Sequence, residues 1–483
     1  MKGPLFFLAV LLFTLSTYAQ EDYLTRQFSP QALQEDFKVL RESLEEAHPG
    51  LYWYRSKQEM DAAFDDMASQ ITSSMTEKEF FTLIEPIIPK VGCLHTRIYP
   101  SEAFSENYWQ EAHFLPLDIW FENGKAYVRN NYSGMEVLEP GLEIVSVNGV
   151  TIPEIINHTM QRIPSDGFTE TLKMFVLNRR YLNVLLNYYY ERVKEYRLVV
   201  KKEGGTEEVI VPGIPTKEYW KVRPEPMKAA IALNFLEGGK VAVLRMNRFD
   251  NWKENGKKYK FRKFLEAYMD QIIESDAEYL IMDVGDQGGG WELHGLEVMK
   301  YLIDEPFTGY QKVEFTKKKW EARKHSNTSW WEYQLYKAIL RFKKSEDGRY
   351  LLAGYKGTKE MEPYDKRFTG KVYMLTSGYT ASATSDFAAL VDYHNLATVV
   401  GEESGGSYVG NTSNYEFIIT LPHSKIRMQV PLARYLLNVG DYPHKGRGVI
   451  PDYQVSQTIE DWMTGRDTQL EFTLDLIRSE MSQ

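Results

Sequence analysis

Residues 371–390 read Lys-Val-Tyr-Met-Leu-Thr-Ser-Gly-Tyr-Thr-Ala-Ser-Ala-Thr-Ser-Asp-Phe-Ala-Ala-Leu, and this stretch decides the fold of the second half of the chain. Its apolar, β-branched run ends at a Ser-Gly pair, and small residues then open a helix-like segment over 381–390. The change of pattern predicts a strand, a sharp turn and the start of a helix, with Ser382 at the junction.

A serine at such a junction can have either of two roles. Ser382 would lie beside the unpaired amides of a helix N-terminus, where negative charge is stabilised. A nucleophilic serine needs that setting, because attack on a carbonyl carbon produces an oxyanion. Serine is also a favoured helix N-cap, so the segment alone leaves a structural role open.

Two other segments contain residues that could take part in chemistry. Residues 279–290 place three glycines, at 288–290, directly after an apolar strand, where glycine lets the backbone approach a ligand and expose its amides. A flexible turn is the alternative, and the spacing matches neither a dinucleotide fingerprint nor a phosphate loop. Residues 91–98, Val-Gly-Cys-Leu-His-Thr-Arg-Ile, contain His95, one of nine histidines.

The composition argues against several classes of partner. The formal net charge of −10 argues against nucleic acid and anionic lipid. Cys93 is the only cysteine, which excludes an internal disulfide. No pair of His, Asp or Glu shows ligand spacing such as His-Glu-x-x-His. We therefore expect no nucleic-acid partner, no cofactor and no metal.

The first 19 residues have the pattern of a secretory signal peptide. One lysine, Lys2, precedes an apolar run over 5–15, and small residues occupy positions 17 and 19. The run is shorter than the roughly 20 apolar residues of a membrane span. We expect cleavage after Ala19 and an exported protein, periplasmic or extracellular, without a membrane span.

The rest of the chain divides into three regions by its pattern. Residues 20–112 show helical spacing and two capping boxes, Ser56 with Glu59 and Thr76 with Glu79, which predict a helical domain. Residues 113–215 carry short strands, interrupted by a helical insertion at about 169–193. Strands and helices alternate over 216–483, which predicts βαβ units and a mostly parallel sheet.

Within the middle region, residues 140–149 read Pro-Gly-Leu-Glu-Ile-Val-Ser-Val-Asn-Gly and resemble the strand-and-turn signature of a PDZ domain. Many hairpins also end in Asn-Gly. A PDZ-like region would bind extended peptides, including free C-termini, by strand addition.

Taken together and in order, these segments resemble the tail-specific or carboxyl-terminal processing peptidases and their tricorn-core relatives. The Gly-x-x-His-Thr motif resembles the tricorn-like branch, which uses histidine with serine. The matching segments are the histidine motif at 92–96, the strand and glycine loop at 283–290, Thr-Ala-Ser-Ala at 380–383, Val-Val-Gly-Glu at 399–402 and Gly-Val-Ile-Pro-Asp at 448–452.

The resemblance implies an α/β multi-domain fold: an N-terminal helical domain, a PDZ-like β-rich domain and a C-terminal ClpP/crotonase-like α/β catalytic domain. It implies an exported serine peptidase that hydrolyses peptide or protein substrates through an acyl-serine intermediate. Ser382 would be the nucleophile and His95 its general base. The amides of Ala383, Gly288 and Gly289 would form the oxyanion hole. Activity should then rise near neutral pH as histidine loses its proton.

The sequence also departs from the family pattern. Ser407 stands where the Ser-Lys branch has its lysine base, and residues 284–287 read Val-Gly-Asp-Gln where the family usually has Leu-Arg-Gly-Asn. No motif supplies the group that orients the histidine, for which Glu402 and Glu403 are candidates. Two alternatives therefore stay open on the same fold: a catalytically inactive peptide-binding protein and a carrier of apolar ligands.

Overall fold

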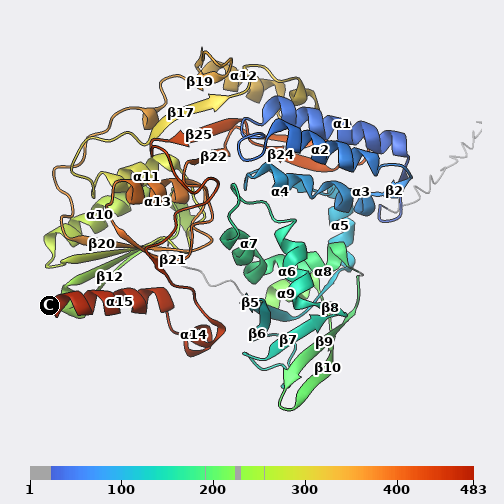
Figure 1. Ribbon diagram of the computed structural model, residues 1–483, viewed down its shortest axis with the longest axis horizontal. Coiled ribbons are helices and arrows are strands. Elements are labelled where there is room, and N and C mark those ends of the chain that lie inside the picture. Colours follow the sequence, from blue (N-terminus) through green and yellow to red (C-terminus); the bar gives the residue numbers. More distant parts are fainter. Residues whose placement is uncertain (1–22, 191, 224–229, 255, 483) are drawn as a thin grey trace, which may run out of the picture.

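The computed structural model describes residues 23–190, 192–223, 230–254 and 256–482 (Figure 1). The expected signal peptide, residues 1–19, lies outside these ranges. Within them, no helix combines the length and the apolar character needed to cross a membrane.

The N-terminal region is built of short helices with well-formed caps. Both capping boxes expected from the sequence are present, at Ser56 with Glu59 and at Thr76 with Glu79. The elements are β1 (Gln27–Phe28), α1 (Pro30–Ala47), α2 (Lys57–Ser69), β2 (Met75–Thr76), α3 (Glu77–Ile84), α4 (Ile87–Val91), β3 (Arg97–Tyr99) and α5 (Glu102–Glu111).

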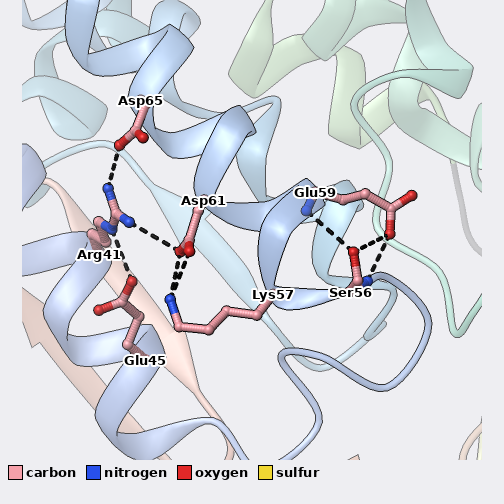
Figure 2. A network of polar contacts seen from close by, with 7 residues as sticks. All are labelled: Arg41, Glu45, Ser56, Lys57, Glu59, Asp61 and Asp65. Atoms are coloured by element: carbon pink, nitrogen blue, oxygen red, sulfur yellow. Dashed lines mark hydrogen bonds and ion pairs between the residues drawn. The ribbon is translucent and has the colours of Figure 1, made fainter.

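Arg41 ties the first two helices together on the outer surface. Its guanidinium donates to Glu45 one turn along α1 at 2.8 Å, and to Asp61 and Asp65 of α2 at 3.0 and 2.6 Å (Figure 2). Lys57 also pairs with Asp61, at 2.7 Å. Partly exposed pairs of this kind contribute little each, so the apolar faces beneath provide most of the stability.

The middle region is an antiparallel sheet with its own apolar core. The strand order is β10-β9-β7-β6-β5, with β8 beside β7. Its elements are β4 (His113–Phe114), β5 (Leu117–Glu122), β6 (Lys125–Asn131), β7 (Glu143–Val147), β8 (Val150–Thr151), α6 (Ile152–Met160), α7 (Thr171–Val176), a π-helical turn (Leu177–Tyr181), α8 (Leu182–Tyr189), β9 (Glu195–Lys202), β10 (Gly205–Pro212), β11 (Ile214–Pro215) and α9 (Thr216–Val222).

The second half of the chain contains a six-stranded sheet in the order β12-β13-β16-β20-β21-β26. All neighbours are parallel except β12 and β13, so the expected mostly parallel sheet is present. The strands are β12 (Ile231–Leu236), β13 (Val241–Met246), β16 (Tyr279–Asp283), β20 (Lys371–Thr376), β21 (Thr398–Gly401) and β26 (Tyr453–Gln454).

Helices cover both faces of this sheet (Figure 1). Leu244, Met282 and Met374 face a core shared with α10, α11 and α13, whereas Ile281 and Leu375 on the other face pack against α15. The elements outside the sheet are β14 (Trp252–Glu254), β15 (Lys257–Tyr259), α10 (Phe261–Glu274), α11 (Glu292–Met299), α13 (Ala383–Tyr393), α14 (Ile459–Thr464) and α15 (Thr468–Met481).

Two further sheets join the ends of the described chain, beside the two-stranded pairs β1-β2, β11-β4 and β14-β15. One has the order β18-β19-β17-β25-β22, and the other, β23-β24-β3, pairs the second half of the chain with β3 of the N-terminal region. The N-terminal helices share one continuous apolar core with this half of the chain. The elements are β17 (Tyr310–Phe315), α12 (Trp330–Ile339), β18 (Phe342–Lys344), β19 (Tyr350–Leu352), β22 (Gly410–Ser413), β23 (Phe417–Thr420), β24 (Arg427–Val430) and β25 (Ala433–Leu437), with 3₁₀ turns at Glu237–Gly239, Glu321–His325 and Lys356–Thr358.

Replacing Phe387 should destabilise the protein strongly, because this side chain of α13 is 1% exposed and packs edge-to-face on Phe249. We expect Phe387→Ala to lower the free energy of unfolding by about 3–5 kcal/mol in urea denaturation. Phe235→Ala, on β12 with the ring 40% exposed, is the matched control and should cost far less. Equal losses of unfolding free energy in the two variants would contradict this packing.

Candidate active site

Ser382 lies in the turn between β20 and α13, directly before the first residue of the helix. Its backbone has φ 53° and ψ −133°, a conformation that residues other than glycine rarely adopt. Its hydroxyl makes no capping hydrogen bond to the helix that it precedes. The structure therefore gives this serine a strained position without the contact that a structural N-cap would make.

His95 meets this hydroxyl from the other end of the chain. Nε2 of His95 lies 3.1 Å from Oγ of Ser382, across a sequence separation of 287 residues. The histidine follows α4, which ends at Gly92 in the left-handed conformation, and precedes β3, which pairs with β24. The two side chains are within the distance at which an imidazole can accept a proton from a hydroxyl.

The surroundings of His95 favour its neutral form. Burial of the ring and, to a lesser extent, the positive charge of Arg97 lower the pKa of His95 to about 4. The nearby carbonyl of Thr412 opposes this shift, but Nδ1 is buried and has no hydrogen-bond partner among the described residues. A neutral imidazole is the form that can act as a general base.

The predicted oxyanion-hole residues gather around the serine. Ala383 is the first residue of α13, and a Cβ added to Gly289 would lie 2.7 Å from Cβ of Ser382. The same addition at Gly288 would meet the ring of Tyr379 at 2.7 Å. Only a backbone without side chains can approach this closely, which is the physical reason for the glycine run.

The carboxylates of Glu402 and Glu403 contact other groups than His95. Glu402 accepts a hydrogen bond from the amide of Gly378 at 3.3 Å. Glu403 binds the guanidinium of Arg447 at 2.8 and 2.5 Å and the amide of Gly448 at 2.8 Å. These bonds hold the loops behind the serine in place.

A carboxylate that the sequence did not single out lies closer to the histidine. Oδ1 of Asp166 accepts a hydrogen bond from the amide of Leu94 at 2.9 Å, and Oδ2 is buried without a partner among the described residues. A carboxylate oxygen of Asp166, a ring nitrogen of His95 and Sγ of Cys93 lie within 4.8 Å of one another. In the sequence Asp166 precedes a glycine, a pair that indicates only a turn.

The cluster of Cys93, His95 and Asp166 also bears on metal binding. Thiolate, imidazole and carboxylate are the donor types of Zn²⁺ sites, although the thiol of Cys93 is itself hydrogen-bonded to the carbonyl of Thr412 at 3.2 Å. Burial raises the pKa of Cys93 to about 12, which disfavours the thiolate. The expectation that the protein binds no metal stays a prediction.

A cleft of about 680 Å³ lies between the middle region and the second half of the chain. Phe175 of α7 stacks on Tyr379 at 4.5 Å between ring centres, and Arg179 donates to Asp286 at 2.8 Å, so the middle region touches the turns on both sides of the serine. Among the side chains lining the cleft are Trp120, Arg129, Arg179, Arg245, Asp283, Asp286, Arg466 and Asp467.

Adding a methyl group at Gly289 should remove activity, because it would collide with Ser382. We expect Gly289→Ala to lower the rate of peptide hydrolysis by about 100-fold or more, in line with the loss of an oxyanion donor. Gly124→Ala is the matched control, since Gly124 also has positive φ but has nothing within 4 Å of an added Cβ. Hydrolysis rates that fall equally in both variants would argue against the predicted role of the glycine loop.

Comparisons with known proteins concern the fold and the family. Residues 240–455 match the sequence model of peptidase family S41. Mature CPAF has the same fold, with a TM-score of 0.62 and 13% sequence identity over 89% of this chain and 94% of that one. Mature CPAF complexed with lactacystin gives a TM-score of 0.63 and 13% identity over 94% and 98%. The photosystem II D1 C-terminal processing protease scores 0.42, with 13% identity over 88% and 93%.

The match to the S41 model and the likeness to CPAF confirm the family resemblance and the α/β multi-domain fold expected from the sequence. The family match covers the strand, turn and helix around Ser382, but it begins after His95 and Asp166. The roles of the individual site residues therefore depend on the geometry described above.

Proposed function

We propose that this protein hydrolyses peptide bonds with Ser382 as nucleophile and His95 as general base, supported by the match of residues 240–455 to the model of peptidase family S41. The observation that carries the proposal is the 3.1 Å contact between Nε2 of His95 and Oγ of Ser382. Two side chains 287 positions apart meet beside a glycine loop and a helix N-terminus, the setting in which an oxyanion is stabilised.

The reaction follows from the positions of these groups. Neutral His95 takes the proton of the Ser382 hydroxyl at Nε2 while Oγ bonds to the substrate carbonyl carbon, and the carbonyl π electrons move to oxygen. In this proposal the amides of Ala383, Gly288 and Gly289 stabilise that oxyanion. His95 then gives its proton to the leaving amine as the C–N bond breaks. In the second half, His95 takes a proton from water at Nε2 while the water oxygen bonds to the acyl carbon. The bond between that carbon and Oγ then breaks, and His95 returns the proton to Oγ, which releases the acid product and the free serine.

The two alternatives from the sequence fit the geometry less well. A non-catalytic serine at a helix start would normally cap the helix, whereas the side chain of Ser382 makes no such bond. A carrier of apolar ligands would need an apolar cavity, but charged side chains such as Arg129, Arg179 and Asp286 line the cleft beside the site. Both features support hydrolysis over mere binding.

Peptide or protein chains are the substrates that the family implies, and the middle region bears on how they bind. The edge of β5 is already occupied: the side-chain amide of Asn178 makes two hydrogen bonds with the backbone of Phe121, at 2.6 and 3.1 Å. Asn183 does the same with Leu115, at 2.8 and 3.1 Å. Strand addition at β5 would have to displace these side chains, so β10 is the open edge for the PDZ-like binding expected from the sequence.

We further propose that the protein acts after export, in the periplasm or outside the cell. The support is the pattern of residues 1–19, whose apolar run is flanked by a lysine and by small residues. A chain with a single, buried cysteine also tolerates an oxidising compartment, because it cannot form internal disulfides.

Covalent labelling of the serine tests the proposed nucleophile. We expect a fluorophosphonate probe to label the wild-type protein at Ser382, as located by peptide mass spectrometry. Ser382→Ala should not be labelled and should lose peptide hydrolysis by a factor of about 10⁴ or more, and His95→Ala should react far more slowly.

Ser385→Ala is the control for this labelling. Its hydroxyl lies one turn further along α13 and donates to the carbonyl of Ser382 at 2.7 Å, outside the reacting atoms. This variant should still be labelled at Ser382. A folded wild-type protein that neither reacts with the probe nor cleaves any peptide in a diverse library would instead favour the inactive peptide-binding protein.

A further inference from the structure

Nδ1 of His95 makes no hydrogen bond that meets the usual geometry within the described residues, although the carbonyl of Thr412 lies near the ring. A carboxylate oxygen of Asp166 lies within 4.8 Å of a ring nitrogen of His95. Both Nδ1 of His95 and Oδ2 of Asp166 are buried and unpaired within the described part of the chain. We propose that Asp166 is the positioning residue of this site, holding the proton of His95 on Nδ1 and stabilising the imidazolium that forms during catalysis. This inference rests on the proposed function.

The local fold holds Asp166 in place for this role. Oδ1 accepts a hydrogen bond from the amide of Leu94, the residue before the histidine, and the amide of Ser407 also favours the ionised carboxylate. Oδ2 makes no hydrogen bond among the described residues and is the oxygen left to contact the ring. The next residue, Gly167, donates its amide to the carbonyl of Gly92 at 3.0 Å. The loop after α6 therefore holds the histidine segment at two points.

The distance between Asp166 and His95 suits a contact that shortens when the imidazole ring becomes positively charged. The three cluster atoms lie within 4.8 Å of one another, a gap that one water molecule or a small rotation of the ring can close. A buried polar group without a partner costs about 1–3 kcal/mol, and more when it is charged. Joining Oδ2 of Asp166 to the Nδ1–H of His95 would remove two such costs at once.

The chemical effect is on the tautomer and on the charge of the ring. When Nδ1 carries the proton and donates it to Asp166, the lone pair on Nε2 faces the hydroxyl of Ser382 and can accept its proton. Asp166 stays ionised throughout and attracts the positive imidazolium. Glu402 and Glu403 cannot share this task in the described geometry, because they bind Gly378 and Arg447.

This arrangement changes the origin of the expected pH dependence. Burial raises the pKa of Asp166 to about 7, against the opposing amide of Leu94, whereas the pKa of His95 is about 4. The site works when His95 is neutral and Asp166 is ionised. Activity should therefore rise as pH increases through about 7, and this rise reports the loss of the proton from Asp166 rather than from the histidine.

Other titratable groups lie near Asp166 and His95, and their titration must be distinguished from that of these two residues. Arg97 and His48 act on His95, and the pKa of His48 is lowered to about 3, so it stays neutral in this range. Tyr54, Cys93 and Asp386 surround Asp166. Burial raises the pKa of Asp386 to about 7 as well, but its carboxylate is bound by Tyr310 and Asn411.

Replacing Asp166 by Asn tests the proposal on the full-length protein. The amide would donate to Nδ1 and stabilise the wrong tautomer, so we expect Asp166→Asn to lower kcat about 10³–10⁴-fold with little change in KM. The rise in activity near pH 7 should also disappear. Asp386→Asn is the matched control, a buried acid of similar pKa whose carboxylate is bound by Tyr310 and Asn411. Because the charge of Asp386 raises the pKa of Asp166, this variant should keep the rise in activity but show it at a lower pH.

Two outcomes would overturn the inference while leaving the proposed function intact. One is an Asp166→Asn variant, labelled at Ser382 like the wild type, whose kcat stays within about threefold. The other is a rise near pH 7 that disappears in Asp386→Asn instead. If the wild type itself is neither labelled nor active, the proposed function has failed, which is a distinguishable result.

A direct measurement keeps the inference testable even if Asp166→Asn does not fold. Nitrogen-15 NMR of histidine in the wild-type protein should show the proton of His95 on Nδ1 at pH 8, and a proton on Nε2 would contradict the proposal. Dialysis against EDTA should leave activity unchanged. A loss of activity that Zn²⁺ restores would instead assign Cys93, His95 and Asp166 to a metal site, and would overturn the inference.

Discussion

The short pairing of β3 with β24 is the contact on which the whole site depends. It places Arg97 opposite Gln429 and Ile98 opposite Met428, immediately after His95 leaves the helical region. A slip of one residue would move the histidine by about 3.3 Å and turn neighbouring side chains to the other face. That shift exceeds the tolerance of a hydrogen bond, so the register of three residue pairs decides whether His95 reaches Ser382. The apolar core shared by the N-terminal helices and the catalytic half holds this register.

The nucleophile depends on a different constraint, which is the close approach of backbones around a strained residue. The positive φ of Ser382 carries a cost of about 1–3 kcal/mol that the surrounding fold has to offset. The buried residues Phe387 and Ala388 of α13 fix the helix behind it, and Gly289 brings the backbone against its side chain. The strained backbone of Ser382 and the buried side chains of α13 thus have the same effect. They keep the Ser382 hydroxyl in front of the helix N-terminus without a capping bond to it.

The sequence predicts those parts of the structure that depend on local pattern. The strand, turn and helix around Ser382, the capping boxes at Ser56 and Thr76 and the mostly parallel sheet all follow from periodicity and turn chemistry. Asp166 could not be found in this way, because its relevance depends on a loop of the middle region meeting the segment before His95. The sequence offers Glu402 as a candidate for the group that orients the histidine, yet its carboxylate accepts a hydrogen bond from the amide of Gly378.

The three regions therefore contribute one side chain each to the proposed line of contact from Asp166 through His95 to Ser382, of which only the contact between His95 and Ser382 is already closed. The outer end of this line is fixed by hydrogen bonds of the segment 167–169: Gly167 to Gly92 at 3.0 Å, Phe168 to Gly446 at 2.7 Å and Thr169 to Gly405 at 3.0 Å. Withdrawal of that segment would have to break all three bonds. Such a movement would separate Asp166 from the ring while β3 still held His95 against the serine. The base and the nucleophile are thus held by the core of the protein, whereas the group that orients them is held by the docking of the middle region.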